Sequence, residues 1–269
     1  MTLETVRFDR DDRGVSTLTL NRPEVHNAFD DAIIESLIAH LKVIAEDPSI
    51  RVLLLRSEGK NFSAGADLNW MRRMADNSHA DNLVDARGLA ELMQRLNALP
   101  QPTIARVQGA AFGGAVGLAA CCDMVVATEA SLFCLSEVKI GLIPAVISPY
   151  VVRAIGERQA RRFFLTAEAF SAPTAQQWGL VHEVVASDSE LDDCCDKLIS
   201  RLLNNGPAAV SAAKSLIAAV SGRHITAEVI EDTARRIADI RVSREGQEGL
   251  SAFLNKRQPD WVQPSKNNN

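Results

Sequence analysis

The stretch TIARVQGAAFGGAVGLAACCDMVVA, residues 103–127, carries the pattern that decides the fold. Thr103 to Val107 is apolar and rich in β-branched residues, which predicts a strand. Residues 109–114 interrupt it with three glycines. Ala115 to Cys122 is small and apolar, as is typical of a buried helix, and Met124 to Ala127 predicts another short strand. A strand, a glycine-rich loop, a helix and a further strand in this order indicate an α/β fold.

The same alternation extends toward the N-terminus. Val15 to Leu20 alternates like a strand, and Val52 to Leu55 is a continuous apolar run that predicts a strand buried on both faces. We expect a helix from about Asp30, and further helices near residues 66–74 and over residues 83–99. The first of these helices has six apolar residues at helical spacing: Ile33, Ile34, Leu37, Ile38, Leu41 and Ile44.

Toward the C-terminus the pattern changes after about residue 200. Leu132 and Phe133 predict one more short strand, and three helices then follow without strands, over residues 190–203, 208–220 and 225–240. The last helix has an apolar stripe of Ile225, Val229, Ile237 and Ile240. Such helices must dock on the core or on another subunit. We therefore expect a core over residues 1–200 and a helical oligomerisation region over residues 201–269, with a polar end that frays from Gln258.

Composition excludes several functional classes. The 269 residues include 29 basic and 34 acidic side chains, so the net charge of −5 gives no footprint for general nucleic-acid binding. No apolar run reaches the roughly 20 residues of a membrane span. The charged N-terminus lacks a signal core, and the five cysteines suggest reduced thiols, so we expect a cytoplasmic protein. The motifs of P-loop, dinucleotide-binding, hydrolase-elbow and zinc-protease sites are missing, and the scattered histidines predict no metal site.

Two glycine-rich loops are candidates for chemistry. One is Phe62-Ser-Ala-Gly-Ala-Asp-Leu68 and the other is Gln108-Gly-Ala-Ala-Phe-Gly-Gly-Ala115. Each follows a predicted strand and precedes a predicted helix, so each presents free backbone N–H groups near a helix N-terminus. Such groups can stabilise a developing oxyanion. Glycine content alone, however, is explained better by tight turns and close helix packing.

A series of ordered motifs gives these loops a more specific meaning. It comprises Asn21-Arg-Pro23 with Asn27-Ala-Phe29, the two glycine-rich loops, Cys122-Asp123, Ser136-Glu137 with Gly141-Leu-Ile-Pro144, and the tail from Glu245 to Arg257. In order and spacing the chain resembles the crotonase superfamily, the enoyl-CoA hydratase/isomerase group. The resemblance implies a crotonase spiral of repeated ββα units with a C-terminal helical region. It also implies a homotrimer or a dimer of trimers.

The resemblance assigns roles to individual residues. The family's oxyanion hole consists of two backbone amides that hold the thioester oxygen of an acyl-CoA, and these positions match Ala66 and Gly114. Family contacts to coenzyme A match Ala64, Asp67 and Leu68, together with the Ala66 and Gly114 loops. Positions that reach the adenine or phosphate region match Phe253 and Lys256 in the tail. Arg22 and His26 match the loop that approaches the pantetheine and the phosphates.

The acid–base groups depart from the family pattern. Hydratases of the family commonly use two glutamates, and Glu137 matches the second one. The first follows the Gly-Gly pair by three residues, where this chain has Gly117. A surface carboxylate is the alternative explanation of Glu137, but its motif context favours a catalytic role. The usual glycine-rich run after the Ile-Pro pair is also replaced, by residues 145–150, which indicates an unusual fit to the acyl group.

Other reactive residues near these motifs have simpler explanations. Cys121, Cys122 and Cys134 flank the motifs without a nearby cation or histidine in the sequence, so we expect buried core thiols rather than nucleophiles. Arg72 and Arg73 follow the first loop. A substrate carboxylate could be bound there, but an exposed helix face is the expected explanation.

The resemblance therefore implies a hydratase of an α,β-unsaturated acyl-CoA. The chain is similar to bacterial hydratases of methylglutaconyl-CoA or gamma-carboxygeranoyl-CoA, which implies a branched or carboxylated substrate such as 3-methylglutaconyl-CoA. Coenzyme A is part of that substrate, so we expect no separate cofactor. One alternative is a Δ3,Δ2-enoyl-CoA isomerase, since relatives with that activity use a single glutamate at the Glu137 position. A second is a non-catalytic or RNA-binding member, which the acidic balance disfavours.

Overall fold

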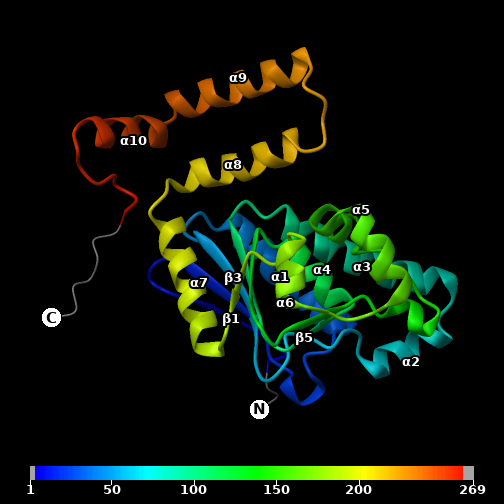
Figure 1. Cartoon of the computed structure of the whole chain (residues 1–269). Helices are drawn as coiled ribbons and strands as arrows, with labels where there is room; N and C mark the ends of the chain where they lie inside the picture. The colour runs from blue at the N-terminus through cyan, green and yellow to red at the C-terminus, as the bar shows by residue number, and fades with distance from the viewer. Residues whose placement is uncertain (1–3, 263–269) are drawn as a thin grey trace.

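The computed structural model describes residues 4–262 and has the expected alternation of strands and helices (Figure 1). The first half contains β1 (Val6–Arg10), β2 (Val15–Leu20), η1 (Pro23–Val25), α1 (Asp31–Glu46), β3 (Val52–Ser57), α2 (Leu68–Asp76), α3 (His79–Asn97), β4 (Thr103–Val107), β5 (Ala110–Phe112), α4 (Gly114–Cys121) and β6 (Met124–Thr128). The second half contains β7 (Leu132–Cys134), η2 (Glu137–Ile140), α5 (Ser148–Thr166), β8 (Phe170–Ser171), α6 (Ala172–Gln177), β9 (Glu183–Val185), α7 (Asp188–Leu203), α8 (Pro207–Val220), α9 (Ala227–Val242) and α10 (Arg244–Leu254).

A six-stranded sheet forms the first layer, in the order β1-β2-β3-β4-β6-β9. Only β1 and β2 run antiparallel, and every other neighbouring pair is parallel. Because successive strand residues face opposite sides, neighbours in sequence belong to different clusters. Val52 packs toward α7, whereas Leu53 faces the main core. The run beginning at Val52 is therefore buried on both faces, as its sequence predicts.

A second, three-stranded sheet has the order β5-β7-β8. Its strands β5 and β7 follow β4 and β6 of the large sheet, and each pair is completed by a helix, α4 or α5. These are the repeated ββα turns that the crotonase resemblance implied. The turn after β3 joins the small sheet through a single bridge between Ser63 and Ala111. This bridge places the first glycine-rich loop directly beside the second.

The helix predicted from residue 30 shows why its pattern was informative. All six of its expected apolar positions are buried. The side chain of Asp30 accepts a hydrogen bond from Ile33 N, which caps the helix and sets its start at Asp31. Local capping and apolar spacing agree here, so both the existence and the start of α1 could be predicted.

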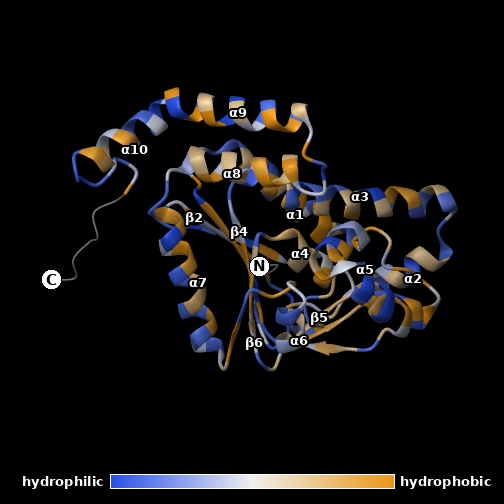
Figure 2. Cartoon of the chain, turned by 45° about the horizontal axis from the view of Figure 1, so that its top comes forward, coloured by the Kyte–Doolittle hydropathy of each residue, from blue (hydrophilic) through white to orange (hydrophobic). Residues whose placement is uncertain are grey.

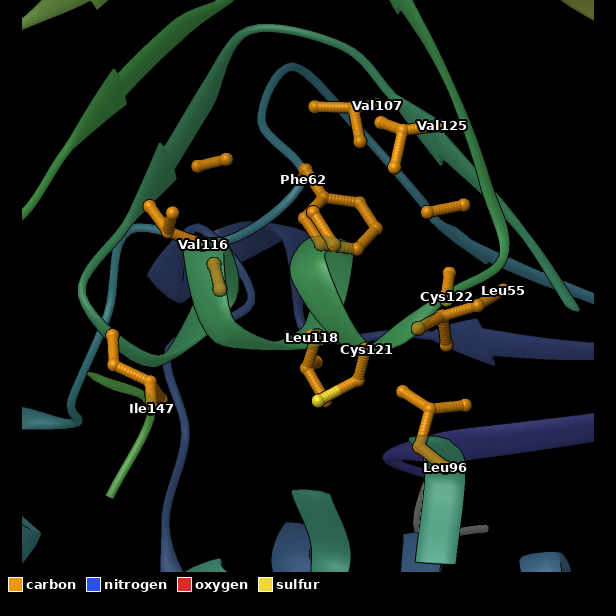
Figure 3. Close-up of a cluster of buried hydrophobic side chains, with 14 of the residues drawn as sticks. Leu55, Phe62, Leu96, Val107, Val116, Leu118, Cys121, Cys122, Val125 and Ile147 are labelled. Carbon is orange, nitrogen blue, oxygen red and sulfur yellow. The ribbon is translucent and has the colours of Figure 1, made fainter. Parts of the chain in front are cut away.

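The centre of the core is the short helix α4 (Figure 3). Its small side chains let neighbouring elements approach closely, and six of its eight residues are buried. Phe62 from the first loop is fully buried and lies between α4 and the strand residues Val107 and Val125. Both glycine-rich loops are thus anchored on the core, the first through Phe62 and the second because it leads into α4.

The tail helices α8, α9 and α10 stand on one side of the sheet core (Figure 1), and they expose apolar as well as polar residues (Figure 2). The stripe prediction was wrong at its start. Thr226 caps α9, so Ile225 lies outside the helix and is 86% exposed. Helix α10 was not predicted as a helix. The expected boundary at residue 200 falls in the last turn of α7, and the fraying expected from Gln258 falls partly outside the described residues.

Several elements in the middle of the chain had no sequence prediction. Helices α5 and α6 are the largest of them, and strand β1 near the N-terminus was not predicted either. Helix α5 bends at Gly156, whose φ of 76° is not helical, and this break obscures its apolar spacing. Strand β5 lies inside the second glycine-rich loop, where the sequence predicts irregular structure. In the part of the chain that the structure describes, no helix is long and apolar enough to cross a membrane.

Candidate active site

The two glycine-rich loops run side by side and are joined by backbone hydrogen bonds. Phe62 N donates to Gln108 O at 2.7 Å, and Ser63 N donates to Ala110 O at 3.0 Å. Phe112 N donates back to Ser63 O at 3.0 Å. Loops that follow two parallel strands of the large sheet are thereby held at a fixed separation, and the residues that come next in each loop share one cavity.

The Ala66 amide is oriented by its neighbours. Phe29 N donates to Gly65 O at 2.8 Å, and Asp67 N donates to Phe29 O at 2.7 Å. In a trans peptide the N–H and C=O groups point in opposite directions, so the Ala66 N–H points away from Phe29. Within residues 4–262 this N–H has no acceptor. Ala66 lies just before the helix cap Asp67, so it is outside α2 itself.

The Gly114 amide is free for a different reason. Gly114 is the first residue of α4, and the first N–H groups of a helix have no partner within it. Gly113 turns the chain into the helix with a φ of 54° and a ψ of −121°, a conformation that strongly favours glycine. Its own N–H donates to Cys134 O at 2.8 Å. In the described chain, Gly114 N likewise has no acceptor.

Ala66 and Gly114 both line a cavity of about 850 Å³. Its wall is mostly apolar and comes from α2, α3, η2 and the segment that follows η2. Members of the first two helices are Leu68, Trp70, Met71, Met74, Asn82, Asp85, Ala86 and Leu89. No motif in the sequence predicts that α3 lies at this cavity. Its four lining residues come from a helix that carries none of the motifs, so only the tertiary fold reveals them.

Glu137 is the carboxylate of this cavity that lies beside the glycine loop. It opens η2, and a Cβ atom placed on Gly113 would lie 3.3 Å from Glu137 Oε1. In the described structure the other oxygen, Oε2, is buried and has no hydrogen-bond partner. Burial raises the pKa of Glu137 above its usual value. A partly buried carboxylate with one unpartnered oxygen, at a cavity that free amides also line, is suited to proton transfer to a bound molecule.

Position 117 has no room for the second glutamate. A Cβ atom on Gly117 would lie 2.2 Å from Cγ2 and 2.8 Å from Cβ of Ile147. Met93 Cε would lie 3.2 Å away on the same side. Ile147 itself lines the cavity. The apolar side chain of Ile147 thus occupies the space beside α4 that a larger residue at position 117 would need.

Comparison with known proteins decides the family. The enoyl-CoA hydratase/isomerase family matches residues 10–264. The chain belongs to the enoyl-CoA hydratase/isomerase family. It is therefore an enzyme, and its fold is the crotonase fold that the motifs implied.

Solved and curated relatives agree with this assignment. The crystal structure of an enoyl-CoA hydratase from Shewanella pealeana superposes with a TM-score of 0.93, at 47% identity and with 97% of both chains covered. The 2,3-dehydroadipyl-CoA hydratase of Escherichia coli is 36% identical over 92% of this chain and 94% of its own length. The 1,2-epoxyphenylacetyl-CoA isomerase of the same species is 34% identical over 93% of this chain and 96% of its own.

The residues that family resemblance placed near coenzyme A divide into two groups. Ala64 and Leu68 line the cavity beside Ala66. Asp67 does not line it and instead caps α2. Arg22 and His26 are also outside the lining. Arg22 bonds to two aspartates, and His26 Nδ1 bonds to Asn61 Nδ2 at 3.1 Å, so both belong to the scaffold of the loops in this structure.

Phe253 and Lys256 lie far from the cavity within one chain. Phe253 is on α10, at the opposite end of the molecule from α2 (Figure 1), and it is 81% exposed. Lys256 follows that helix with a left-handed φ of 54°. Neither contributes to the cavity lining. A contact between these residues and a bound coenzyme A would therefore require the tail of a second copy.

The cysteines and surface arginines have the simpler roles that the sequence favoured. Cys121, Cys122 and Cys134 are buried free thiols. Burial raises the pKa of Cys122 to about 12, which opposes formation of a thiolate. Arg72 donates to Asn69, and Arg73 pairs with Asp31 at 2.5 Å, both on an exposed face.

Proposed function

We propose that this enzyme adds water to an α,β-unsaturated acyl-CoA thioester whose acyl group is branched or carboxylated, such as 3-methylglutaconyl-CoA. The observation that carries the proposal is the position of the Glu137 carboxylate. Its unpartnered carboxylate oxygen is buried beside a cavity that is also lined by the Ala66 and Gly114 backbones. The cavity wall is mostly apolar, which suits a hydrocarbon acyl chain.

The chemistry follows from three groups. Glu137 takes a proton from a water molecule, and the resulting hydroxide bonds to the β-carbon. The electron pair of the double bond moves toward the thioester, whose oxygen becomes an enolate held by Ala66 N–H and Gly114 N–H. Glu137 then returns the proton to the α-carbon on the same face. Each fixed donor to such an oxyanion is worth roughly 10²–10³ in rate.

A single carboxylate is sufficient for this sequence of steps. Syn addition places the proton removed from water and the proton delivered to carbon on one face of the substrate. Gly117 and Ile147 leave an apolar surface where the family's first glutamate would stand. A second carboxylate carried by the substrate itself would help to orient the water. We therefore favour an acidic acyl group.

Coenzyme A is proposed to enter past the first loop. Ala64 and Leu68 line the cavity next to Ala66, and Leu68 is 68% exposed. Phe253 and Lys256 are proposed to contact the adenine or phosphate end from a neighbouring subunit of a homotrimer or a dimer of trimers. The cytoplasmic location expected from the sequence remains a prediction.

The second candidate is a Δ3,Δ2-enoyl-CoA isomerase. One specific observation favours it: the space beside Gly117 is filled by apolar Ile147 rather than by a second acid–base group. A 1,3-proton shift needs only one base, because the same carboxylate can remove a proton at one carbon and return it at another. The same oxyanion hole would serve both reactions.

A panel of enoyl-CoA thioesters with straight, branched and carboxylated acyl groups tests the proposal. Mass spectrometry of the products should show the addition of one water to the branched or carboxylated members. Gly114→Pro removes one proposed donor and should abolish turnover. If no member of the panel gains water, the hydratase proposal is wrong. If a straight-chain member is hydrated fastest, the substrate class is wrong.

A further inference from the structure

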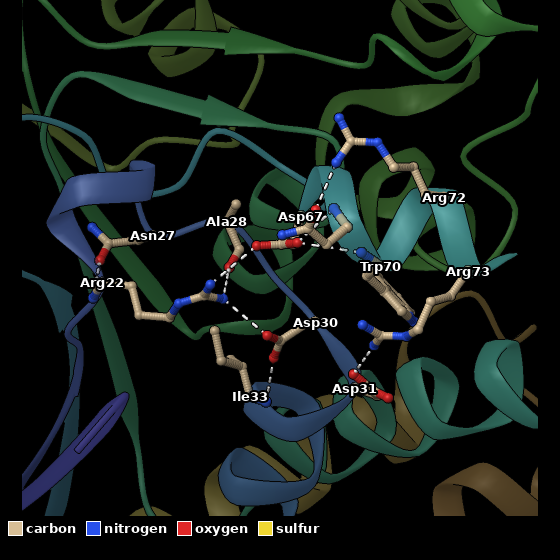
Figure 4. Close-up of polar contacts among 11 residues, drawn as sticks. Arg22, Asn27, Ala28, Asp30, Asp31, Ile33, Asp67, Trp70, Arg72 and Arg73 are labelled. Carbon is tan, nitrogen blue, oxygen red and sulfur yellow. Dashed lines mark hydrogen bonds and ion pairs between the residues drawn. The ribbon is translucent and has the colours of Figure 1, made fainter. Parts of the chain in front are cut away.

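The guanidinium of Arg22 lies between the starts of two helices (Figure 4). Its Nη1 donates to Asp30 Oδ2 at 2.9 Å and to Ala28 O at 3.3 Å. Its Nη2 donates to Asp67 Oδ2 at 3.1 Å. Asp30 is the N-cap of α1 and Asp67 is the N-cap of α2. One planar group therefore connects two helix caps and the backbone just before Phe29.

Both oxygens of the Asp67 carboxylate accept hydrogen bonds in this arrangement. Its Oδ1 accepts from Asn69 N at 2.8 Å and from Trp70 N at 3.2 Å, while Oδ2 faces Arg22. The side chain of Asp67 is 9% exposed and that of Arg22 is 20% exposed. Burial alone would raise the pKa of Asp67, but the two backbone donors and the guanidinium outweigh it, and the pKa is lowered. Asp67 is therefore a fixed anion at neutral pH.

Arg22 and Asp67 hold both sides of the backbone bridge between Phe29 and Ala66, which orients the Ala66 N–H. On one side, Asp67 directly follows Ala66 and its own N–H donates to Phe29 O. On the other side, Ala28 directly precedes Phe29 and its carbonyl accepts from Arg22. The Gly65–Ala66 peptide lies between these two fixed points. A change at Arg22 would thus be transmitted to the direction of the Ala66 N–H.

We propose that Arg22 is a positioning residue that fixes the Ala66 amide through Asp67 and Ala28 without touching the substrate. This inference rests on the proposed function, in which Ala66 N–H stabilises an enolate oxygen. Arg22 does not line the cavity. Its planar fork can reach three acceptors at once, which the single ammonium of a lysine cannot reproduce. This role differs from the approach to the pantetheine and the phosphates that the family resemblance implies for Arg22.

Three variants test the role. Arg22→Met removes the guanidinium and keeps much of the apolar stem. Arg22→Lys keeps the charge but loses the fork. Asp67→Asn keeps an oxygen that can cap α2 but replaces the anion that faces Arg22. Arg73→Met is the matched control, because Arg73 on α2 also pairs with an aspartate at the start of α1, Asp31, but this pair lies on the exposed surface.

The expected effect is on kcat rather than on KM. A misplaced catalytic group can cost up to roughly 100-fold, so Arg22→Met and Asp67→Asn should each lower kcat by about 10- to 100-fold with a much smaller change in KM. Arg22→Lys should restore only part of the loss, and Arg73→Met should match the wild type. The Arg22→Met/Asp67→Asn double variant should lose no more activity than the more damaging of the two single variants, because both changes act along one path.

The probe that separates positioning from general stability is acetoacetyl-CoA, whose enolate resembles the proposed intermediate. Ultraviolet absorbance against pH gives the pKa of the bound ligand. Wild type should lower it relative to free acetoacetyl-CoA, and Arg22→Met should lower it less at saturating ligand and below the unfolding temperature. If Arg22→Met matches the wild type in this shift and in kcat, the positioning role is wrong. If the wild type gives no shift, the oxyanion hole itself is wrong, and the role of Arg22 fails with it.

Discussion

Glu137 combines burial, an unpartnered oxygen and a place at the cavity, and its removal is the most direct change at the residue scale. We expect Glu137→Gln to lower kcat by roughly 10²–10⁴, the usual worth of general acid–base catalysis. Because burial raises the pKa of Glu137 and the base form is the carboxylate, the acid limb of kcat/KM against pH should lie above the range of an ordinary glutamate. Near wild-type hydration by this variant would refute the assignment.

The same carboxylate should make the fold less stable at neutral pH. A group whose folded-state pKa is raised contributes stability below its unfolded pKa, and that stability is lost as pH rises through the folded value. Glu137→Gln should therefore unfold at a higher urea concentration than wild type near pH 7, with the difference shrinking toward acidic pH. A difference that grows as pH falls would contradict this sign.

Gly117 tests whether the missing glutamate can be restored. A Cβ there would overlap Ile147, so Gly117→Glu should destabilise the fold by at least the roughly 1–3 kcal/mol typical of overpacking. Gly117→Ala is the control with a smaller side chain. Its Cβ overlaps Ile147, which destabilises the fold, but alanine also gains about 1 kcal/mol in helix propensity over glycine. Urea unfolding should show that adding Ile147→Ala recovers part of the Gly117→Glu loss. Unchanged stability of Gly117→Glu would show that the packing around Ile147 yields easily.

Individual site residues were predictable only where a motif marked them. Ala66, Gly114 and Glu137 stand in short signatures, and all three line the cavity. Arg22 also stands in a signature, but its partners Asp30 and Asp67 come from two different loops that only folding brings together. Ile147 and the α3 wall have no local signal, because an apolar side chain in a cavity looks like any other core residue in the sequence.

At the scale of elements, one ion pair joins the tail to the sheet. Lys214 Nζ on α8 lies 2.7 Å from Asp123 Oδ2, and the same oxygen accepts from Thr103 N at the start of β4. The pair is partly buried, so Lys214→Met should lower the free energy of unfolding by about 1.5–3 kcal/mol. The exposed pair of Arg235 and Glu231 is the control, where Arg235→Met should cost about 0–1 kcal/mol. Equal losses in urea unfolding would contradict the distinction.

Elements were predictable where local signals agreed. The strand Thr103–Val107 has the predicted bounds, and α1 has a cap as well as a clear apolar face. Helix α5 lacks a side-chain cap and contains the break at Gly156, so its sequence gives conflicting signals. For α9, the cap at Thr226 overrode the apolar residue that precedes it.

At the scale of the whole molecule, the tail leaves large apolar side chains uncovered. Exposed members on α8, α9 and α10 are Ile217, Ile230, Ile237, Val242, Leu250, Phe253 and Leu254. Surfaces of this kind are typical of subunit contacts. Multi-angle light scattering should give about three or six times the chain mass of 29.2 kDa. The double variant Ile230→Asp/Ile237→Asp should shift that mass downward, whereas Val43→Asp on α1 should not.

A wild-type mass of 29.2 kDa at micromolar concentration would contradict the assembly. It would also remove the route by which Phe253 and Lys256 could reach coenzyme A, since neither lines the cavity of its own chain. The proposed contact of the tail with coenzyme A therefore depends on the proposed assembly.

The central claim, hydration by one carboxylate and two backbone amides, is tested most directly by isotope incorporation. The enzyme is incubated with 3-methylglutaconyl-CoA in ¹⁸O water, and the products are resolved by mass spectrometry, with Glu137→Gln as the control. We predict one ¹⁸O atom in a β-hydroxyacyl-CoA product of the wild type and its loss in the variant. A product without ¹⁸O whose double bond has moved would contradict hydration and establish the isomerase instead.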